Sequence, residues 1–240
     1  MNCLAIIPAR GGSKRIPRKN IKEFCGQPII KYSIDVAIES CCFNEIMVST
    51  DDIEIAKIAK KYGAQVPFFR SKINSNDFAT LADVIKEVLD SYKKIQKQYD
   101  YVCCILATAP FVNKKRIIDG FDILKECKAD SLVSVIKFNY PIQRALKIDD
   151  SKLQMFWPEN YNVRSQDLVS AYHDAGQFYW INSKSYLEQK RIFADYTIPL
   201  IIPNNEVQDI DTEDDWIIAE FKYNFLKNVN KGKGELCSNL

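Results

Sequence analysis

The residues best suited to do chemistry lie close together near the start of the chain. Within residues 10–19, five cations occur without a carboxylate between them: Arg10, Lys14, Arg15, Arg18 and Lys19. Such a cluster repels itself unless an anion lies among its members. Gly11 and Gly12 permit backbone dihedrals that a side chain would forbid, and they allow a ligand to approach the backbone closely. The stretch therefore predicts a polyphosphate site to which the glycine amides would also point.

Two well-known phosphate loops do not explain this stretch. Residues 11–14, Gly-Gly-Ser-Lys, have neither the spacing nor the order of a Walker loop, and the spaced glycines of a dinucleotide loop are absent. By composition alone, a solvated basic loop or a nucleic-acid patch explains the cations equally well. Position favours a small anionic ligand, because residues 3–7 form a short apolar run typical of a buried parallel strand. Open α/β folds bind ligands at the carboxyl ends of such strands.

A second group is the acidic segment that contains Asp209 and Asp211. Residues two apart in an extended segment project to the same side, so the two carboxylates can face one point. Two hard oxygen donors beside a polyphosphate site are what a magnesium–nucleotide complex requires. A structural role explains them equally well, because Asp211 also begins an acidic first turn before a helix predicted from Glu213. On the residues alone, both interpretations stay open.

Strand and helix signals alternate along the first two-thirds of the chain. Apolar runs predict strands at residues 3–7, 46–49, 66–69, 101–106 and 131–137. Apolar stripes and capping residues predict helices at 28–40, 52–62, 80–97 and 114–127, the second of them capped by Asp51. Strands at 176–181 and 198–202 and a helix from about 213 to 226 follow. The alternation predicts an α/β fold with a doubly wound, mostly parallel sheet.

Segment 139–175 interrupts this rhythm with two prolines, aromatic residues and short polar runs. An excursion of this length is too long for an idle loop, so it is predicted to be functional or an interface. Residues 1–229 are predicted to form one domain that contains this insertion. Residues 230–240 are predicted to be a disordered tail.

Composition and charge exclude several classes of protein. The 33 basic residues nearly balance the 31 acidic residues, which argues against a dedicated nucleic-acid binder. No stretch resembles a secretion signal, and no apolar run approaches the ~20 residues that span a bilayer. We therefore expect a cytoplasmic protein with no membrane or nucleic-acid partner. The eight cysteines include two adjacent pairs and no Cys-x-x-Cys, so they are predicted to be reduced and mostly buried.

Residues 6–20, Ile-Ile-Pro-Ala-Arg-Gly-Gly-Ser-Lys-Arg-Ile-Pro-Arg-Lys-Asn, resemble a nucleotide-binding signature. It is the signature of the acylneuraminate cytidylyltransferase family, which activates nine-carbon, sialic-type sugars as CMP conjugates. The resemblance extends over about residues 3–225 and is closest to the branch whose sugar is pseudaminic acid. It implies a Rossmann-like nucleotidyltransferase fold, CTP and a nonulosonic acid as substrates, and Mg²⁺ as cofactor. It also implies a homodimer in which segment 139–175 is an arm that reaches the neighbouring subunit's active site.

The resemblance also assigns roles to individual residues. Asp209 and Asp211 match the family's metal-binding position, and Arg70 and Thr80 match positions that help to read the cytosine ring. The expected catalytic residues are Arg10, Lys19, Asp209 and Asp211, with Lys19 at the α-phosphate. The expected CTP-binding residues are Ala9, Arg10, Gly11, Gly12, Ser13, Lys14, Lys19, Asn20, Arg70 and Thr80. Without this context, Arg70 would be taken for an exposed surface arginine.

One departure from the family pattern concerns the sugar. The sialic-acid activators carry Gln-Pro-Thr-Ser-Pro after the fourth strand, whereas residues 106–110 of this chain are Leu-Ala-Thr-Ala-Pro. An apolar side chain in place of a polar sugar contact indicates a different nonulosonic acid, because an unpartnered buried polar group is costly. Pseudaminic acid differs from sialic acid in its C7 to C9 substitution and stereochemistry, so a changed pocket is expected.

The residues expected at the sugar are Gln177, Tyr179, Phe193, Arg164 and His173. Gln177 and Tyr179 project to one side of a strand by its two-residue period. Arg164 matches an arginine of the family's interface arm, and Arg144 is a weaker parallel. Phe193 is explained equally well as core. The single histidine, His173, is expected near the substrate without a role in proton transfer.

The function that these observations predict is transfer of CMP from CTP to the anomeric hydroxyl of pseudaminic acid, with release of pyrophosphate. The same chemistry on legionaminic acid, N-acetylneuraminic acid or Kdo stays open as an alternative. So does a noncatalytic nucleotide-binding module, although such a module has less need of the Asp209 and Asp211 pair. A nucleic-acid binder ranks third.

Overall fold

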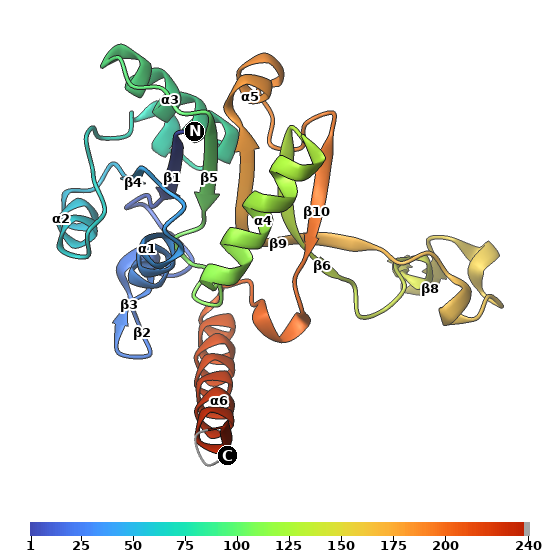
Figure 1. Cartoon of the computed structure of the whole chain (residues 1–240). Coiled ribbons are helices and arrows are strands. Elements are labelled where there is room, and N and C mark those ends of the chain that lie inside the picture. Colours follow the sequence, from blue (N-terminus) through green and yellow to red (C-terminus); the bar gives the residue numbers. More distant parts are fainter. Residues whose placement is uncertain (238–240) are drawn as a thin grey trace.

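The computed structural model describes the backbone of residues 1–237 and the side chains of residues 1–229. Its centre is a six-stranded sheet with the strand order β10-β6-β9-β5-β1-β4 (Figure 1). Its strands are β1 (Cys3–Pro8), β4 (Glu45–Ser49), β5 (Tyr101–Ile105), β6 (Ser131–Lys137), β9 (Tyr172–Asn182) and β10 (Thr197–Ile201). β9 is antiparallel to its two neighbours, and the other neighbouring pairs are parallel. The predicted α/β fold with a mostly parallel sheet is confirmed.

Helices cover both faces of this sheet, and the side chains of β1 alternate between the two helical layers. Cys3, Ala5 and Ile7 belong to an apolar cluster shared with the helices of one layer. Leu4 and Ile6 belong to a cluster on the opposite face. The first layer contains α1 (Ile29–Ser40), α2 (Ile53–Lys61) and α4 (Lys114–Cys127), and the second contains α3 (Leu81–Lys94) and α5 (Ser183–Gln189). The unbroken apolar run of β1 is therefore buried on both faces, as predicted.

Segment 66–69, predicted to be a strand, is not one. The chain pairs with β4 through a single bridge at Gln65. Pro67 has no backbone N–H with which to continue a ladder. The chain turns instead, and the Arg70 amide donates to the Thr50 carbonyl at 2.8 Å. This turn carries Arg70 to the carboxyl end of the sheet.

Two helix boundaries also differ from the prediction. α2 is capped by Asp52 rather than Asp51, because the Asp52 carboxylate accepts two amides of the first helical turn at 2.9 and 3.0 Å. Asp51 instead accepts the amide of Gly11. α3 ends at Lys94, before the predicted end at Lys97.

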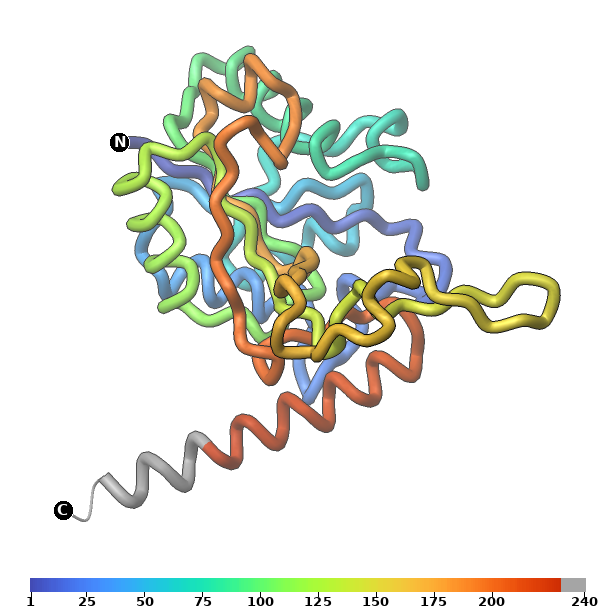
Figure 2. Tube along the Cα trace, turned by 90° about the vertical axis from the view of Figure 1, so that its right-hand side faces the viewer, coloured from blue at the N-terminus to red at the C-terminus, as the bar shows by residue number. Residues whose placement is uncertain are grey.

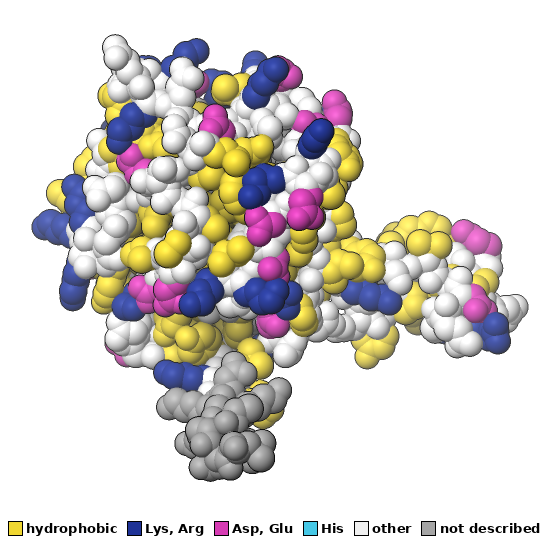
Figure 3. All heavy atoms as spheres, in the orientation of Figure 1, with side chains coloured by type: hydrophobic (Ala, Val, Ile, Leu, Met, Phe, Trp, Pro, Cys, Tyr) yellow, Lys and Arg dark blue, Asp and Glu magenta, His cyan; other side chains and the backbone are white. Residues whose placement is uncertain are grey.

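The insertion after β6 leaves the body of the molecule as an arm (Figures 1 and 2). It contains a hairpin made of β7 (Leu146–Asp149) and β8 (Lys152–Met155), together with three short 3-10 turns. Apolar side chains are exposed along it, among them Ile148, Leu153 and Trp157. Figure 3 shows this as hydrophobic surface on the projecting arm. Such a surface is typical of an interaction site.

β9 connects this arm directly to the centre of the sheet. It begins at Tyr172, before the predicted start at Gly176, because Tyr172–Asp174 pair with the last residues of β6. The pairing then shifts register and resumes at Tyr179–Ile181. Gly176 lies inside this irregularity with φ +61°, a conformation that glycine adopts readily.

The last helix, α6 (Glu213–Cys237), packs one face against the first loops of the chain. Its residues Trp216 and Ala219 join Ile16 and Phe24 in an apolar cluster. The helix continues beyond Leu226, where the sequence predicts its end. Of the tail predicted at 230–240, residues 238–240 lie outside the described residues.

Short strands β2 (Glu23–Phe24) and β3 (Gln27–Pro28) precede α1.

The cysteines described by the structure are free thiols. Cys3, Cys103 and Cys104 are buried, as predicted, whereas Cys41 and Cys127 are exposed. Across the described side chains, no group of three or more His, Cys, Asp or Glu residues could hold a metal ion. No helix within the described residues is long and apolar enough to cross a membrane.

Candidate active site

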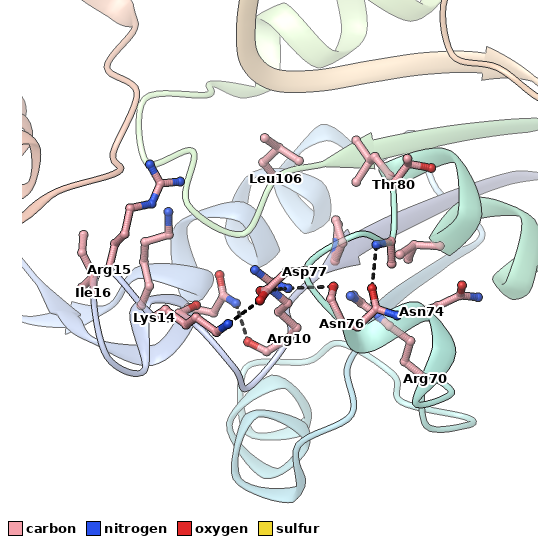
Figure 4. Close-up of a pocket in the computed structure, with 17 residues that line it drawn as sticks. Arg10, Lys14, Arg15, Ile16, Arg70, Asn74, Asn76, Asp77, Thr80 and Leu106 are labelled. Atoms are coloured by element: carbon pink, nitrogen blue, oxygen red, sulfur yellow. Dashed lines mark hydrogen bonds and ion pairs between the residues drawn. The ribbon is translucent and has the colours of Figure 1, made fainter.

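A cavity of about 320 Å³ lies at the carboxyl ends of β1 and β5 (Figure 4). This volume falls in the lower range of small-molecule sites, which starts at about 300 Å³. The loop after β1, the turn Lys19–Ile21, the loop before α3 and the residue after β5 contribute to its walls. Seven of the residues expected at CTP line it: Arg10, Ser13, Lys14, Lys19, Asn20, Arg70 and Thr80.

The three other residues expected at CTP, Ala9, Gly11 and Gly12, are not among the described lining residues of the cavity. Ala9 is fully buried and donates its amide to the Ser49 carbonyl at 2.9 Å. The Gly11 amide donates to the Asp51 carboxylate at 2.9 Å. A Cβ at Gly11 would lie 2.8 Å from a carboxylate oxygen of Asp52, so no side chain fits there. Around Gly12 the space is open. The Gly11 amide therefore already points at an anion of the protein itself, the Asp51 carboxylate, rather than into the cavity.

Four of the five clustered cations line the cavity: Arg10, Lys14, Arg15 and Lys19. Arg18 points elsewhere, and its guanidinium contacts Asp52 at 2.5 Å and Glu54 at 2.6 Å. The hydrogen bond from Arg18 holds the pKa of the Asp52 carboxyl at about 2. Arg18 also has a left-handed backbone with φ 56°. It therefore fastens the basic loop to the start of α2 and leaves four cations facing the cavity.

Lys19 and Asn20 hold the loop in place from the side of the short turn. The Lys19 ammonium, only 20% exposed, donates to the Ile210 carbonyl at 2.7 Å. The Asn20 amide, 8% exposed, donates to the Arg10 carbonyl at 2.9 Å. Lys19 thereby connects the basic loop to the acidic segment around Ile210, which is distant in sequence.

Arg70 is a buried wall of the cavity rather than a surface arginine. It is 9% exposed and donates to the Ser49 hydroxyl at 3.0 Å and to the Ser49 carbonyl. Burial lowers the pKa of its guanidinium. Thr80 also lines the cavity and is the N-cap of α3, in a capping box with Asp83. Both residues are therefore held in fixed positions at the edge of the cavity.

Asp211 lies beside the basic loop, at 2.9 Å from Arg15 and 3.4 Å from Lys19. It does not cap α6, because Thr212 and Asp215 perform that role. The Asp215 carboxylate accepts the Thr212 amide at 2.8 Å, and the Thr212 hydroxyl accepts the Asp215 amide at 3.2 Å. The capping interpretation of Asp211 is therefore wrong, and its carboxylate faces cations.

Asp209 and Asp211 supply carboxylate oxygens, the donor type that Mg²⁺ prefers, although neither lines the cavity. Mg²⁺ keeps several water and phosphate oxygens and takes one or two carboxylates from a protein. Asp209 is exposed, and Asp211 adjoins cations that line the cavity. These residues would hold the ion only together with a bound polyphosphate, because the described residues offer no larger donor group.

The residues expected at the sugar are not among the described lining residues of this cavity. Gln177 and Tyr179 are buried on β9. Gln177 donates its side-chain amide to the Glu206 carbonyl at 2.5 Å, and the Tyr179 hydroxyl donates to Asp174 at 2.7 Å. Burial, followed by the carboxylates of Asp174 and Asp209, raises the pKa of Tyr179. β9 is nevertheless adjacent to the cavity, since its Gln177 carbonyl accepts the amide of the lining residue Leu106 at 2.8 Å.

Three other residues expected at the sugar are exposed and outside the cavity. Arg164 pairs with Asp167 inside the arm at 2.7 Å. His173 packs against the Phe138 ring at 4.6 Å between centroids, as a structural histidine would. Phe193 is 56% exposed, so its interpretation as core is wrong.

The arrangement of the cavity is that of an anion site with further polar side chains beside it. Four cations line it, and Figure 4 shows the buried Arg70 and the exposed Thr80 at the end away from Lys14 and Arg15. A sequence profile described as Cytidylyltransferase matches residues 4–223. The chain belongs to this cytidylyltransferase family.

Individual relatives of this cytidylyltransferase agree with that assignment. Pseudaminic acid cytidylyltransferase of Campylobacter jejuni subsp. jejuni is 44% identical over 224 residues, which are 93% of this chain and 97% of that protein. CMP-N,N'-diacetyllegionaminic acid synthase of Legionella pneumophila is 36% identical over 231 residues, 92% of this chain and 95% of that protein. N-acylneuraminate cytidylyltransferase of Escherichia coli is 29% identical over 238 residues, which are 99% of this chain and 55% of that protein.

Two solved structures share the fold of this cytidylyltransferase. CMP:2-keto-3-deoxy-manno-octonic acid synthetase complexed with CTP has a TM-score of 0.66 at 14% identity, covering 95% of this chain and 100% of that chain. 4-Diphosphocytidyl-2C-methyl-D-erythritol synthase of Anaerococcus prevotii has a TM-score of 0.63 at 18% identity, covering 93% and 98%. At these identities the likeness establishes the nucleotidyltransferase fold.

Some lining residues of this cytidylyltransferase are not recognisable from the sequence. Asn74, Asn76 and Asp77 come from the polar loop before α3. Asp77 contacts Arg10 at 2.9 Å and Lys14 at 2.5 Å. The one local signal is that this loop follows Arg70 and ends at the Thr80 cap, so its residues must pass the cavity edge.

Proposed function

We propose that this cytidylyltransferase transfers CMP from CTP to pseudaminic acid, giving CMP-pseudaminic acid and pyrophosphate. The observation that carries the proposal is the cavity in which Arg10, Lys14, Arg15 and Lys19 meet at the carboxyl end of β1. Its chemistry suits a triphosphate, since each phosphate oxygen can be met by a cationic donor. The choice of sugar is supported by the 44% identity to the Campylobacter jejuni protein of that name.

In the proposed reaction the anomeric hydroxyl oxygen attacks the α-phosphorus of CTP. A new oxygen–phosphorus bond forms, the hydroxyl proton passes to water, the bond to the bridging oxygen breaks, and pyrophosphate leaves with that electron pair. Negative charge spreads over phosphoryl oxygens, so the protein contributes mainly by positioning and electrostatic stabilisation. Lys19 is assigned to the α-phosphate because its ammonium is mostly buried and fixed by the Ile210 carbonyl. When bound by Asp209 and Asp211, Mg²⁺ would neutralise phosphate charge and make the attacking hydroxyl more acidic.

The proposed position of the nucleoside follows from the polar side chains beside the cations. Arg70 and Thr80 stand there, with Asn20 near the basic loop. Arg70 is already hydrogen-bonded to Ser49, so its position at the cytosine does not depend on a ligand to order it. A pyrimidine edge carries few hydrogen-bonding groups, and two or three fixed side chains with backbone groups are enough to read it.

For the sugar we propose the side of the cavity where Leu106 meets β9. Leu106 lines the cavity and is hydrogen-bonded through its amide to Gln177. An apolar wall here suits a deoxygenated or acylated part of the sugar better than a hydroxyl. Gln177, Tyr179 and Phe193 stay predictions for sugar contact.

The experiment that tests this function compares three sugars in one assay. The purified chain is incubated with CTP, Mg²⁺ and either pseudaminic, N,N'-diacetyllegionaminic or N-acetylneuraminic acid, and pyrophosphate release is followed. We expect release with pseudaminic acid at a kcat/KM at least about tenfold above the other two, because a misplaced polar group costs about 1–3 kcal/mol. A higher rate with either other sugar would keep the chemistry and overturn the substrate. No release with any sugar would overturn the enzyme proposal.

We also propose that the enzyme acts as a homodimer in which the arm reaches the partner's sugar site. The exposed side chains Ile148, Leu153 and Trp157 support this, as does the absence of Arg164 from the described lining of its own chain's cavity. Sedimentation equilibrium should give about twice the 27.6 kDa of one chain. Ile148→Asp should shift it toward the monomer, whereas a monomeric parent protein would contradict the proposal. A cytoplasmic location stays a prediction.

A further inference from the structure

Asp77 is the one carboxylate among the described residues that line the cavity. One of its oxygens lies 2.9 Å from the Arg10 guanidinium, and the other lies 2.5 Å from the Lys14 ammonium (Figure 4). A single carboxylate thus bridges two of the four cations that face the cavity. The side chain is 42% exposed, so the bridge is open to exchange with a ligand from solvent.

The loop that carries Asp77 is fixed at several points. The Asn76 carbonyl accepts a hydrogen bond from Arg10 at 2.8 Å. The Asn76 side-chain oxygen accepts the backbone amides of Phe78 and Ala79, at 2.7 and 2.9 Å. At its start, Glu87 of α3 accepts the Ser71 amide at 2.7 Å. At its end, Thr80 begins α3 in the capping box. Asp77 is therefore held at the basic loop by its backbone as well as by its charge.

This arrangement makes the Asp77 carboxylate a competitor for any phosphate. Arg10 and Lys14 cannot give their full donor capacity to Asp77 and to a phosphate oxygen at once. A phosphate at these two cations also meets the Asp77 charge at close range, and like charges repel. A ligand with a single phosphate at Lys19 would leave the bridge in place. The competition therefore acts on the pyrophosphate portion of a ligand more than on its α-phosphate.

We propose that Asp77 is a built-in counter-anion that weakens the hold of Arg10 and Lys14 on pyrophosphate and so lets this product leave. The inference rests on the proposed function, because it takes the cavity to be the phosphate site. Asp77 acts through the two cations and is a positioning residue. It weakens the binding of the triphosphate and speeds the release of the product. Its effect on affinity is larger for a ligand with several phosphates than for a ligand with one.

The test measures binding of inorganic pyrophosphate with Mg²⁺ by calorimetry to three full-length proteins. These are the parent, Asp77→Asn and the control Asp90→Asn. Asp90 is 44% exposed and pairs with Lys86 on α3, away from the phosphate cavity, so its variant makes the same change in net charge. We expect Asp77→Asn to bind pyrophosphate about fivefold more tightly, as two partly exposed ion pairs no longer compete. Asp90→Asn should match the parent.

Steady-state kinetics provide a second measurement, which would not change in this way if Asp77 had only a structural role. For Asp77→Asn we expect a lower KM for CTP and stronger inhibition by pyrophosphate, without a rise in kcat. Asp77→Glu, which keeps the charge, should restore the parent's values, and Asp77→Ser serves if the asparagine variant does not fold. Equal or weaker pyrophosphate binding by Asp77→Asn overturns the inference even where CMP transfer is intact. If no variant binds pyrophosphate and no sugar gives release, the proposed function falls with it.

Discussion

Replacing Lys19 with alanine is expected to lower the rate of pyrophosphate release by about 100- to 1,000-fold, the usual effect of removing one fixed donor from a charged transition state. The Lys19 ammonium is only 20% exposed, and the Ile210 carbonyl and Asp211 hold it between the basic loop and the acidic segment. The cavity-lining Arg15 also reaches the acidic segment, at 2.9 Å from Asp211, but its side chain is 67% exposed. The measurement is single-turnover release with saturating CTP and sugar, so that product dissociation does not hide the effect.

The same substitution should leave the protein folded. It removes the hydrogen bond to the Ile210 carbonyl at 2.7 Å and a longer one to Asp211 at 3.4 Å. A hydrogen bond from a charged donor contributes about 1.5–3 kcal/mol, against a typical stability of about 5–15 kcal/mol. Lys22→Ala is the matched control, because Lys22 lies in the same turn region, pairs with Glu213 and does not line the cavity. An unfolded Lys19→Ala protein would assign Lys19 a structural role. Near-normal activity in a folded Lys19→Ala protein would show that Lys19 takes no part in the reaction.

Asp211→Asn or Asp209→Asn is expected to lower activity by about 100-fold. The two carboxylates would hold a metal ion, and such an ion stabilises the developing phosphate charge of the transition state by several kcal/mol. The change is nearly isosteric, and Thr212 and Asp215 still cap α6, so the fold should be kept. Rates are measured over a range of Mg²⁺ concentrations. For Asp211→Asn the half-saturating concentration should rise well above that of the parent.

Asp214→Asn is the control for this pair, because Asp214 is exposed in the same acidic turn. It should keep the parent's rate and its Mg²⁺ dependence. Removing Mg²⁺ with a chelator should abolish release by the parent and by Asp214→Asn alike. Variants at 209 and 211 that respond to Mg²⁺ as the parent does would show that these carboxylates do not hold the ion.

The parts of the site that the sequence predicts are those encoded in contiguous residues. An apolar strand followed by glycines and cations places Arg10, Lys14 and Lys19 at the carboxyl end of β1, and the structure has them there. Arg18 shows the limit of the same reasoning. Its neighbours in sequence suggest a fifth phosphate ligand, whereas its partners, Asp52 and Glu54, lie at the start of α2 and direct it away.

Residues that act through contacts distant in sequence could not be predicted. Asp77 reaches the basic loop only because segment 66–69 turns away from β4 instead of pairing with it. That turn depends on Pro67 and on the hydrogen bond from the Arg70 amide to the Thr50 carbonyl. The sugar residues could not be placed for a different reason. Arg164 lies on the arm that leaves the body of the molecule and pairs there with Asp167, so its role at the sugar depends on the proposed dimer.

The central place of β9 in the sheet has a consequence for how the chain is made. β5 and β6 are both complete by residue 137, yet neither can satisfy its inner edge until residues 172–182 arrive between them. During synthesis the nascent chain therefore carries one open edge of β5 and both edges of β6 while the whole arm is being translated, because β10, the other neighbour of β6, is made later still. Unpaired edges invite contact with other chains. Efficient production of this enzyme should depend on how quickly ribosomes pass the codons of the arm, far from any residue that touches a substrate.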